Sequence, residues 1–324
     1  MYKRLTSAEE RKKRWRRVTL VILGSLFFFI FNWTYEAREI AHTMPMSEKL
    51  NIYAWVRQRE VSSVQLQLIA EQTGVHEDVI GKLLWEGHWQ QVLELQQAYF
   101  QPVYTKSENS SLLTVSEYLV DDAGRYVKGT RMVDIQDGDI LITKNSRFLG
   151  WRNGHAGIVV NAEEGLVLEA IMLGTNTRLC SVKKWEEYPA FMLLRLKEEV
   201  SEGMLSEKYR RENVPEKMSD ALIERVTLAQ FAAGYASEYL VDIPYQLLAG
   251  IYDRVFDTKE ITVHAAEQAG LTTIPALKGT QCAHLVWYAY KQVGIDLDSD
   301  GGLIVTPYDI QNSPYLDVIQ LYGY

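Results

Sequence analysis

Sixteen consecutive uncharged residues, Val18 to Trp33, directly follow a strongly basic N-terminus. The first 17 residues hold eight Lys or Arg against two Glu, a net charge of +6. As a helix this run would span about 24 Å, whereas the hydrocarbon core of a bilayer is about 30 Å thick. Trp15, Trp33 and Tyr35 suit the membrane interfaces, and flanking Arg side chains reach headgroups, which makes up the difference. The pattern predicts a transmembrane anchor over 18–34.

Two other interpretations of the apolar run fit less well. A cleaved signal peptide needs a small residue two positions before its small cleavage residue, but Ala37 follows Tyr35 and Ala41 follows Glu39 at that spacing. A buried core helix would not adjoin eight basic residues. Since cytoplasmic flanks carry the excess of Lys and Arg, we expect residues 1–17 to be a cytoplasmic tail and the later residues to lie outside, in a single-pass protein of the cell membrane.

The composition excludes several functional classes. The 324 residues carry a formal net charge of −8, so the +6 at the N-terminus leaves −14 on the other 307 residues. This balance argues against nucleic acid as a partner. Two cysteines are too few for a disulfide scaffold or a multi-cysteine metal centre. None of the six histidines has ligand spacing to another His, Cys or carboxylate cluster, so we expect no metal and no cofactor.

Residues 35–111 are predicted to form a helical, membrane-proximal segment. Between 47 and 101 apolar residues recur every three to four positions. Gly74 and Gly87 interrupt this pattern and Pro102 ends it. We expect a spacer, because the acidic charge disfavours the alternative of a DNA-binding helix-turn-helix. The same segment is the candidate surface for a protein partner.

From residue 112 onward the pattern changes to short runs rich in β-branched and aliphatic residues, separated by Gly, Asn and Asp. A charged connector follows over 197–220. Apolar stripes then predict helices over 222–240 and 281–293, and LDVIQLY predicts a final strand. Helices segregated from strands in this way indicate an α+β fold, with an antiparallel sheet packed on helices over 112–324.

Cys282 is the first candidate for chemistry. Thr280 is a plausible N-cap, which would place Cys282 in the first turn of a helix. The partial positive charge at a helix N-terminus favours a nucleophilic thiolate, and the backbone N–H groups there can stabilise an oxyanion. The alternative is an inert core cysteine. Cys180, among strand-like residues, is predicted to be such a packing residue.

His155 is the candidate base, because GHAGIVV places it at the start of an apolar strand, directly after Gly154. HAGIVV, NAEEG and LVLEA together predict a β-hairpin. If its loop has an odd number of residues, His155 and Glu169 lie on one face, opposite each other or one pair removed. The carboxylate would then orient the imidazole. An even loop would defeat this pairing, and a Glu at an exposed sheet edge is the alternative. His284 is expected on the helix surface.

Five segments together resemble the permuted papain-like amidase family, the YiiX/YaeF-type relatives of NlpC-like cysteine hydrolases. They are QDGDILIT, GHAGIVV, LVLEAI, QCAHLVWYAYKQVGIDLD and VTPYDIQNSPYLDVI, within residues 132–324. As in that family, the histidine precedes the cysteine. The resemblance implies a circularly permuted papain-like domain, with Cys282 as nucleophile, His155 as base and Glu169 as orienting residue.

The resemblance also suggests substrate-binding residues and an activity. IPYQLLAGIYD is similar to the family's PY segment, so Tyr245 would line the site beside Gly154, although a buried core tyrosine fits equally. We expect a membrane-anchored, extracytoplasmic cysteine hydrolase that cleaves amide bonds, with cell-wall peptides as the first substrate class. One alternative is a lipid acyltransferase or deacylase on the same site. Another is a non-catalytic module that binds a partner through residues 47–101.

Overall fold

The computed structural model describes residues 12–13, 15–28, 30, 42–43, 48–58, 60–101, 103–109, 114–148, 151–200, 227–251 and 277–323. Residues 15–28 form an uninterrupted helical run, which at 1.5 Å per residue spans about 21 Å. Within the described ranges, no helix is both long enough and apolar enough to cross a membrane. The prediction of a transmembrane helix ahead of the α+β domain, together with the membrane localisation that depended on it, is therefore wrong. Residues 31–41 lie outside the described residues.

The predicted helices between residues 47 and 101 are present. They are α2 (Tyr53–Val56), α3 (Ser63–Thr73), α4 (Glu77–Trp85) and α5 (Trp89–Tyr99). A capping box between Ser62 and Gln65 fixes the start of α3, and Gly74 ends it at φ +68°. A side chain at Gly74 would collide with the carbonyl of Leu321, so the glycine lets this helix end approach the last strand closely.

A small antiparallel sheet lies partly within residues 35–111, the range predicted to be helical. Its strand order is β1-β2-β3-β5. The strands are β1 (His42–Thr43), β2 (Val103–Asn109), β3 (Thr114–Val120) and β5 (Ser146–Phe148).

The main sheet has six strands in the order β10-β9-β4-β6-β7-β8, and every neighbouring pair is antiparallel. The strands are β4 (Ile140–Thr143), β6 (His155–Asn161), β7 (Leu166–Glu169), β8 (Arg178–Ser181), β9 (Phe191–Leu196) and β10 (Leu316–Tyr322), with α6 (Val182–Trp185) between β8 and β9. The antiparallel sheet that the sequence predicts is thus confirmed.

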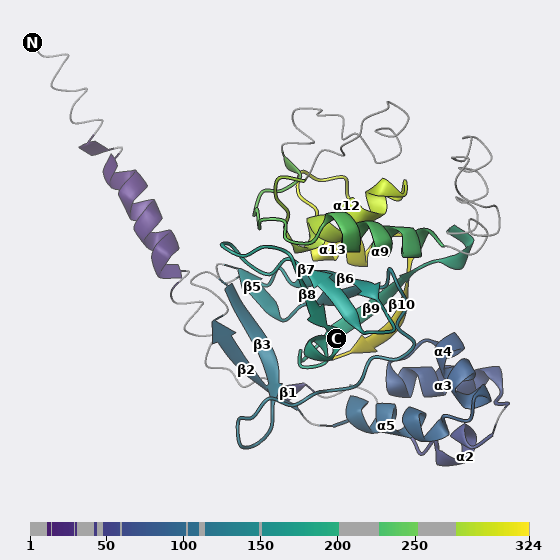
Figure 1. Ribbon diagram of the computed structural model, residues 1–324. Coiled ribbons are helices and arrows are strands. Elements are labelled where there is room, and N and C mark those ends of the chain that lie inside the picture. Colours follow the sequence, from purple (N-terminus) through teal and green to yellow (C-terminus); the bar gives the residue numbers. More distant parts are fainter. Residues whose placement is uncertain are drawn as a thin grey trace, which may run out of the picture.

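Helices cover both faces of this sheet (Figure 1). On one side lie α9 (Leu228–Tyr239), α12 (Cys282–Gln292) and α13 (Pro307–Gln311). On that face Ile140 and Ile158 share a buried cluster with α9 and α12, whereas the opposite face, through Leu141 and Val159, joins the core formed by α2–α5. Alternating residues of one strand therefore serve two cores, since side chains alternate between the faces of a sheet.

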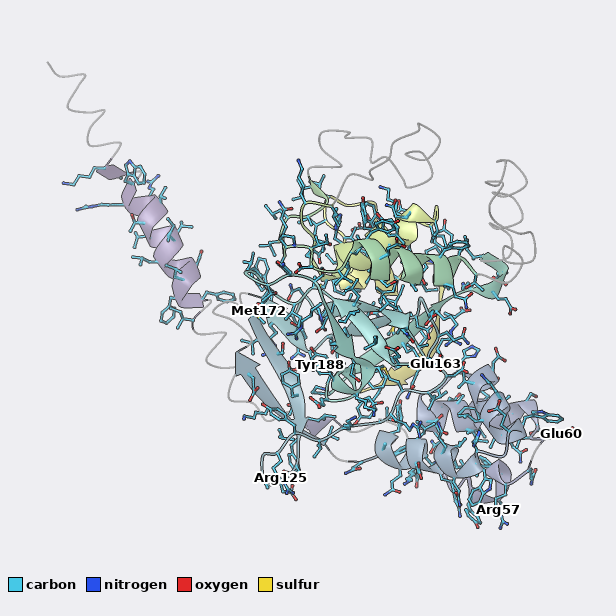
Figure 2. The ribbon with its side chains drawn as sticks, in the orientation of Figure 1. Arg57, Glu60, Arg125, Glu163, Met172 and Tyr188 are labelled. Carbon is cyan, nitrogen blue, oxygen red and sulfur yellow. The ribbon has the colours of Figure 1, made fainter. Side chains whose placement is uncertain are left out.

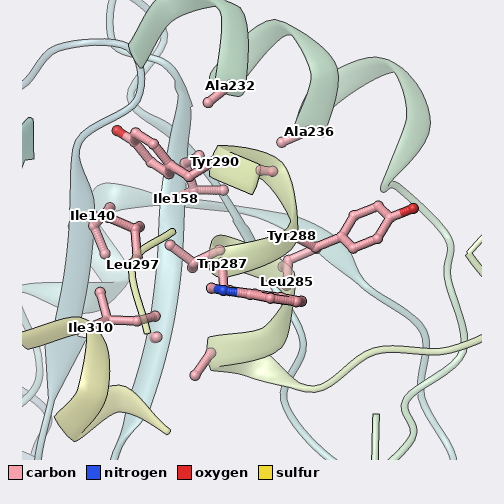
Figure 3. Packing of buried hydrophobic residues seen from close by; sticks show 14 of the residues in the cluster. Ile140, Ile158, Ala232, Ala236, Leu285, Trp287, Tyr288, Tyr290, Leu297 and Ile310 are labelled. Carbon is pink, nitrogen blue, oxygen red and sulfur yellow. The ribbon is translucent and has the colours of Figure 1, made fainter. Parts of the chain in front are cut away.

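Helix α12 lies at the centre of the first core. Figure 3 shows Leu285, Trp287 and Tyr288 of α12 gathered with residues of the sheet and of α9. Of the eleven residues of α12, only Lys291 is not buried. At the outside of the molecule, by contrast, Figure 2 shows Arg57 and Glu60 at the rim of the α2–α5 helices.

Replacing Leu285 by Ala tests how far the fold depends on α12. Leu285 is fully buried, so we expect the Leu285→Ala variant to lose about 2–5 kcal/mol of unfolding free energy through lost burial and a residual cavity. Urea denaturation followed by circular dichroism measures this loss. Leu303→Ala is the matched control because Leu303 is 59% exposed. An equal loss in the two variants would contradict a central role for α12.

Candidate active site

Cys282 is the first residue of α12, one position nearer the helix start than predicted. Gln281, not Thr280, is the N-cap, and its side-chain Oε1 accepts a hydrogen bond of 2.9 Å from the N–H of Ala283. The Thr280 hydroxyl instead lies 3.0 Å from Nδ1 of His284. The prediction of Thr280 as N-cap is therefore wrong, because its side chain is committed to another partner. The thiol of Cys282 also reaches Gln281, with 3.4 Å from Sγ to Oε1.

His155 and Glu169 share one face and one end of the main sheet. His155 begins β6 and Glu169 ends β7. Glu169 pairs with Gly157, so His155 lies one pair beyond it on the same face. His155 Nε2 donates a hydrogen bond to Glu169 Oε2 across 3.0 Å, and both residues are buried. His155 and Glu169 therefore lie on one face of the sheet, one pair removed, which is the arrangement predicted for a hairpin with an odd loop.

The prediction attributed the shared face of His155 and Glu169 to a loop with an odd number of residues, and the structure has another cause for it. The loop between β6 and β7 has four residues, 162–165, and an even loop alone would put His155 and Glu169 on opposite faces. The register shifts by one residue between Val159 and Asn161, at a β-bulge. A bulge adds one residue to one strand and so restores the pairing of like parity.

Cys282 and Glu169 both raise the pKa of the His155 ring. Burial alone would lower the pKa of His155, but the nearby Cys282 side chain, the hydrogen bond with Glu169 and the charges of these two groups raise it to about 9. Since Nε2 is bonded to Glu169, Nδ1 is the ring nitrogen left for the thiol. The structure thus brings Cys282, His155 and Glu169 together in the order that a nucleophile, a base and an orienting carboxylate require.

Trp185 is a neighbour of the site that the sequence reasoning missed. Its ring stacks on the His155 ring, with centroids 5.0 Å apart and an interplanar angle of 11°. A Cβ at Gly157 would lie 2.8 Å from Val167 and 2.9 Å from Trp185. The second glycine of GHAGIVV therefore makes room for the indole, and it was the sequence signal for a large group on this face.

Glu169 has two further neighbours, both on β8. Nε and Nη2 of Arg178 each donate to Glu169 Oε1 across 3.3 Å. Burial opposes the ionisation of Glu169, but His155 and Arg178 more than offset this, and its pKa lies below the ordinary value. The pKa of Cys180 is raised to about 12, first by burial and then by the charge of Glu169. Cys180 is half-buried against the core of α2–α5, as a packing residue would be.

Tyr245 lies beside the start of α12. It forms an isolated parallel bridge with Thr280, and its N–H donates to the carbonyl of Thr175. Burial, and then the charge of Cys282, raise the pKa of its hydroxyl well above the ordinary value. Gly154 adopts φ +74°, and a Cβ there would lie 2.7 Å from the carbonyl of Thr143. Its observed role is to let the chain turn tightly into β6.

His284 is fully buried, which contradicts its predicted position on the helix surface. Besides its contact with Thr280, its ring packs against Trp287 and Tyr288. Gly250 adopts φ +86°, and a Cβ there would lie 2.9 Å from the His284 ring. The prediction failed because α12 is enclosed on nearly every side, so position on a helix did not decide exposure.

The groups that resemble ligand sites are made of residues other than Cys282, His155 and Glu169. The carboxylates of Asp298, Asp300 and Asp309 lie within 4.8 Å of one another, but Asp309 is engaged as the capping-box partner of Thr306 at the start of α13. Two cavities of about 360 and 780 Å³ are lined by residues other than Cys282, His155 and Glu169.

Comparison with known proteins adds no relative. No protein-family model, curated protein or solved structure matches the chain. The fold and site define an α+β protein with a buried cysteine–histidine–glutamate cluster. The resemblance to the permuted papain-like amidases stays a prediction.

The effect of Glu169 on His155 can be measured by titration. We expect the His155 ring to titrate near pH 9 in the parent protein and at a lower pH in Glu169→Gln, because an amide carries no negative charge to stabilise the imidazolium, although Cys282 still raises the pKa. NMR of the histidine rings over pH 5–10 measures both values, with the signal assigned by its loss in His155→Gln. Glu163→Gln is the control, since Glu163 lies in the turn of the same hairpin (Figure 2). A pKa that stays near 9 in Glu169→Gln would contradict the assignment.

Proposed function

We propose that this chain is a cysteine hydrolase that cleaves amide bonds through Cys282, His155 and Glu169. The observation that carries the proposal is one buried imidazole that is hydrogen-bonded to the Glu169 carboxylate and lies close enough to Cys282 for that side chain to raise its pKa. The thiol is the first residue of a helix, and the imidazole beside it can take its proton when it attacks. The nucleophile, base and orienting group thus come from three different elements, α12, β6 and β7.

The first half-reaction would acylate the cysteine. The Cys282 thiolate attacks the amide carbon, a C–S bond forms, and the carbonyl electron pair moves onto oxygen. The backbone N–H of Cys282 stabilises this oxyanion, whereas that of Ala283 is bonded to Gln281, and Tyr245 lies near enough to feel the charge of Cys282. When the C–N bond breaks, the imidazolium of His155 gives its proton to the departing nitrogen.

The second half-reaction would release the acid. His155, now neutral, takes a proton from water, and the oxygen of that water attacks the thioester carbon. The C–S bond breaks, the thiolate returns, and the imidazolium is regenerated. Glu169 stays ionised in both steps and holds the ring through Nε2. Cell-wall peptides are the substrate class that the family resemblance places first, and this choice rests on analogy.

The two cysteines provide an internal comparison for a first test. At pH 7 we expect iodoacetamide to alkylate Cys282 at least about ten-fold faster than Cys180, because a thiol with a pKa of about 12 stays protonated. His155→Ala should slow alkylation of Cys282 and leave Cys180 unchanged. Mass spectrometry of the labelled peptides gives both rates in one sample.

Turnover is tested with purified bacterial cell-wall peptides, by counting the amino groups released. Cys282→Ala should abolish release, and Cys180→Ala is the matched control that should retain it. Equal release by Cys282→Ala and the parent, or a Cys282 alkylation rate that is the same in His155→Ala, would disprove the proposed function. Release of fatty acid from an acylated lipid, with none from the peptides, would replace amide hydrolysis by the lipid alternative.

A further inference from the structure

Arg178 binds Glu169 from the side opposite to His155. The two residues face each other directly in the register of β7 and β8. Both Nε and Nη2 of Arg178 reach the same oxygen, Oε1, at 3.3 Å each. The Glu169 side chain is 3% exposed and that of Arg178 is 49% exposed, so the guanidinium reaches from solvent into a buried carboxylate.

The two oxygens of Glu169 are thereby divided between two groups. Oε2 accepts from Nε2 of His155, and Oε1 accepts from the guanidinium fork. A buried carboxylate needs hydrogen-bond donors for its lone pairs, and Arg178 supplies two of them. Because the fork is planar and approaches one oxygen, it also fixes the rotation of the carboxylate about its own axis.

We propose that Arg178 is a fourth, positioning member of this site, which shares the charge of Glu169 and so limits how tightly Glu169 holds the proton of His155. This role rests on the proposed function. A carboxylate bound only to His155 would concentrate its negative charge on the imidazolium, whereas a carboxylate shared with a guanidinium does so less.

The consequence falls on the second half-reaction, in which His155 must be neutral to accept a proton from water. Below its pKa, the neutral fraction of a histidine falls ten-fold for each unit by which that pKa rises. Sharing the carboxylate with Arg178 thus keeps more of the base available at neutral pH.

Other titratable groups also lie around His155 and Glu169. Cys282 of α12 faces His155. Cys180 of β8 and Tyr188, which follows α6, interact electrostatically with Glu169, and Lys184 of α6 acts on Cys180. Of these neighbours only Arg178 donates hydrogen bonds to Oε1 as a permanent cation, so its removal changes the charge on Glu169 most directly.

Substitution of Arg178 tests this role through the titration of His155. We expect Arg178→Met to raise the pKa of His155 by about half a unit to one unit, and to slow hydrolysis at pH 7 about three- to ten-fold. Arg178→Lys restores the positive charge and should return the pKa close to that of the parent. Ring NMR gives the pKa values, and release of amino groups from cell-wall peptides gives the rates.

The matched control is Lys183→Gln, which removes a positive charge from exposed Lys183 in the next element along the chain. It should leave the His155 titration unchanged. An unchanged or lowered pKa of His155 in Arg178→Met overturns the proposal, as does a shift of the same size in Lys183→Gln. The NMR titration needs no substrate, so these outcomes stay distinct from failure of the proposed function, which the Cys282 and His155 variants report.

Discussion

The hydrogen bond between His155 and Glu169 is the interaction on which the rest of the site depends. Both side chains are buried, where an unpaired carboxylate would be costly. Glu169 is stabilised there by the imidazole on one oxygen and by Arg178 on the other, and the same bond sets the orientation of the ring toward Cys282. The chemistry of the thiol is thus tied to a carboxylate on a different strand.

The position of the site within the sheet explains how three elements meet. The main sheet is buried on both faces, by α9 and α12 on one side and by the core of α2–α5 on the other. His155 begins its strand, so its ring lies at the sheet end, where Trp185 stacks on it and Cys282 at the start of α12 can reach it.

The sequence predicted the antiparallel α+β fold and the helices between residues 47 and 101, because both follow from local periods of apolar residues. It paired His155 with Glu169 only for an odd loop, whereas the loop is even and a bulge restores the pairing. The predictions of the cap of α12 and of the transmembrane helix were wrong. Thr280 could cap α12 but bonds His284, and Gln281 caps instead. The apolar run after the basic N-terminus predicted a transmembrane helix, and no described helix has the required length and apolar character.

The sequence by itself determined which residues are candidates for the proposed chemistry: a cysteine at a helix start, a histidine at the start of a strand, and one charged residue inside LVLEAI. Tertiary structure decided how these residues meet. The bulge between Val159 and Asn161 compensates for an even loop and puts Glu169 on the face of His155. Trp185 and Arg178 come from α6 and β8, so their contacts with His155 and Glu169 depend on these elements packing beside β6 and β7.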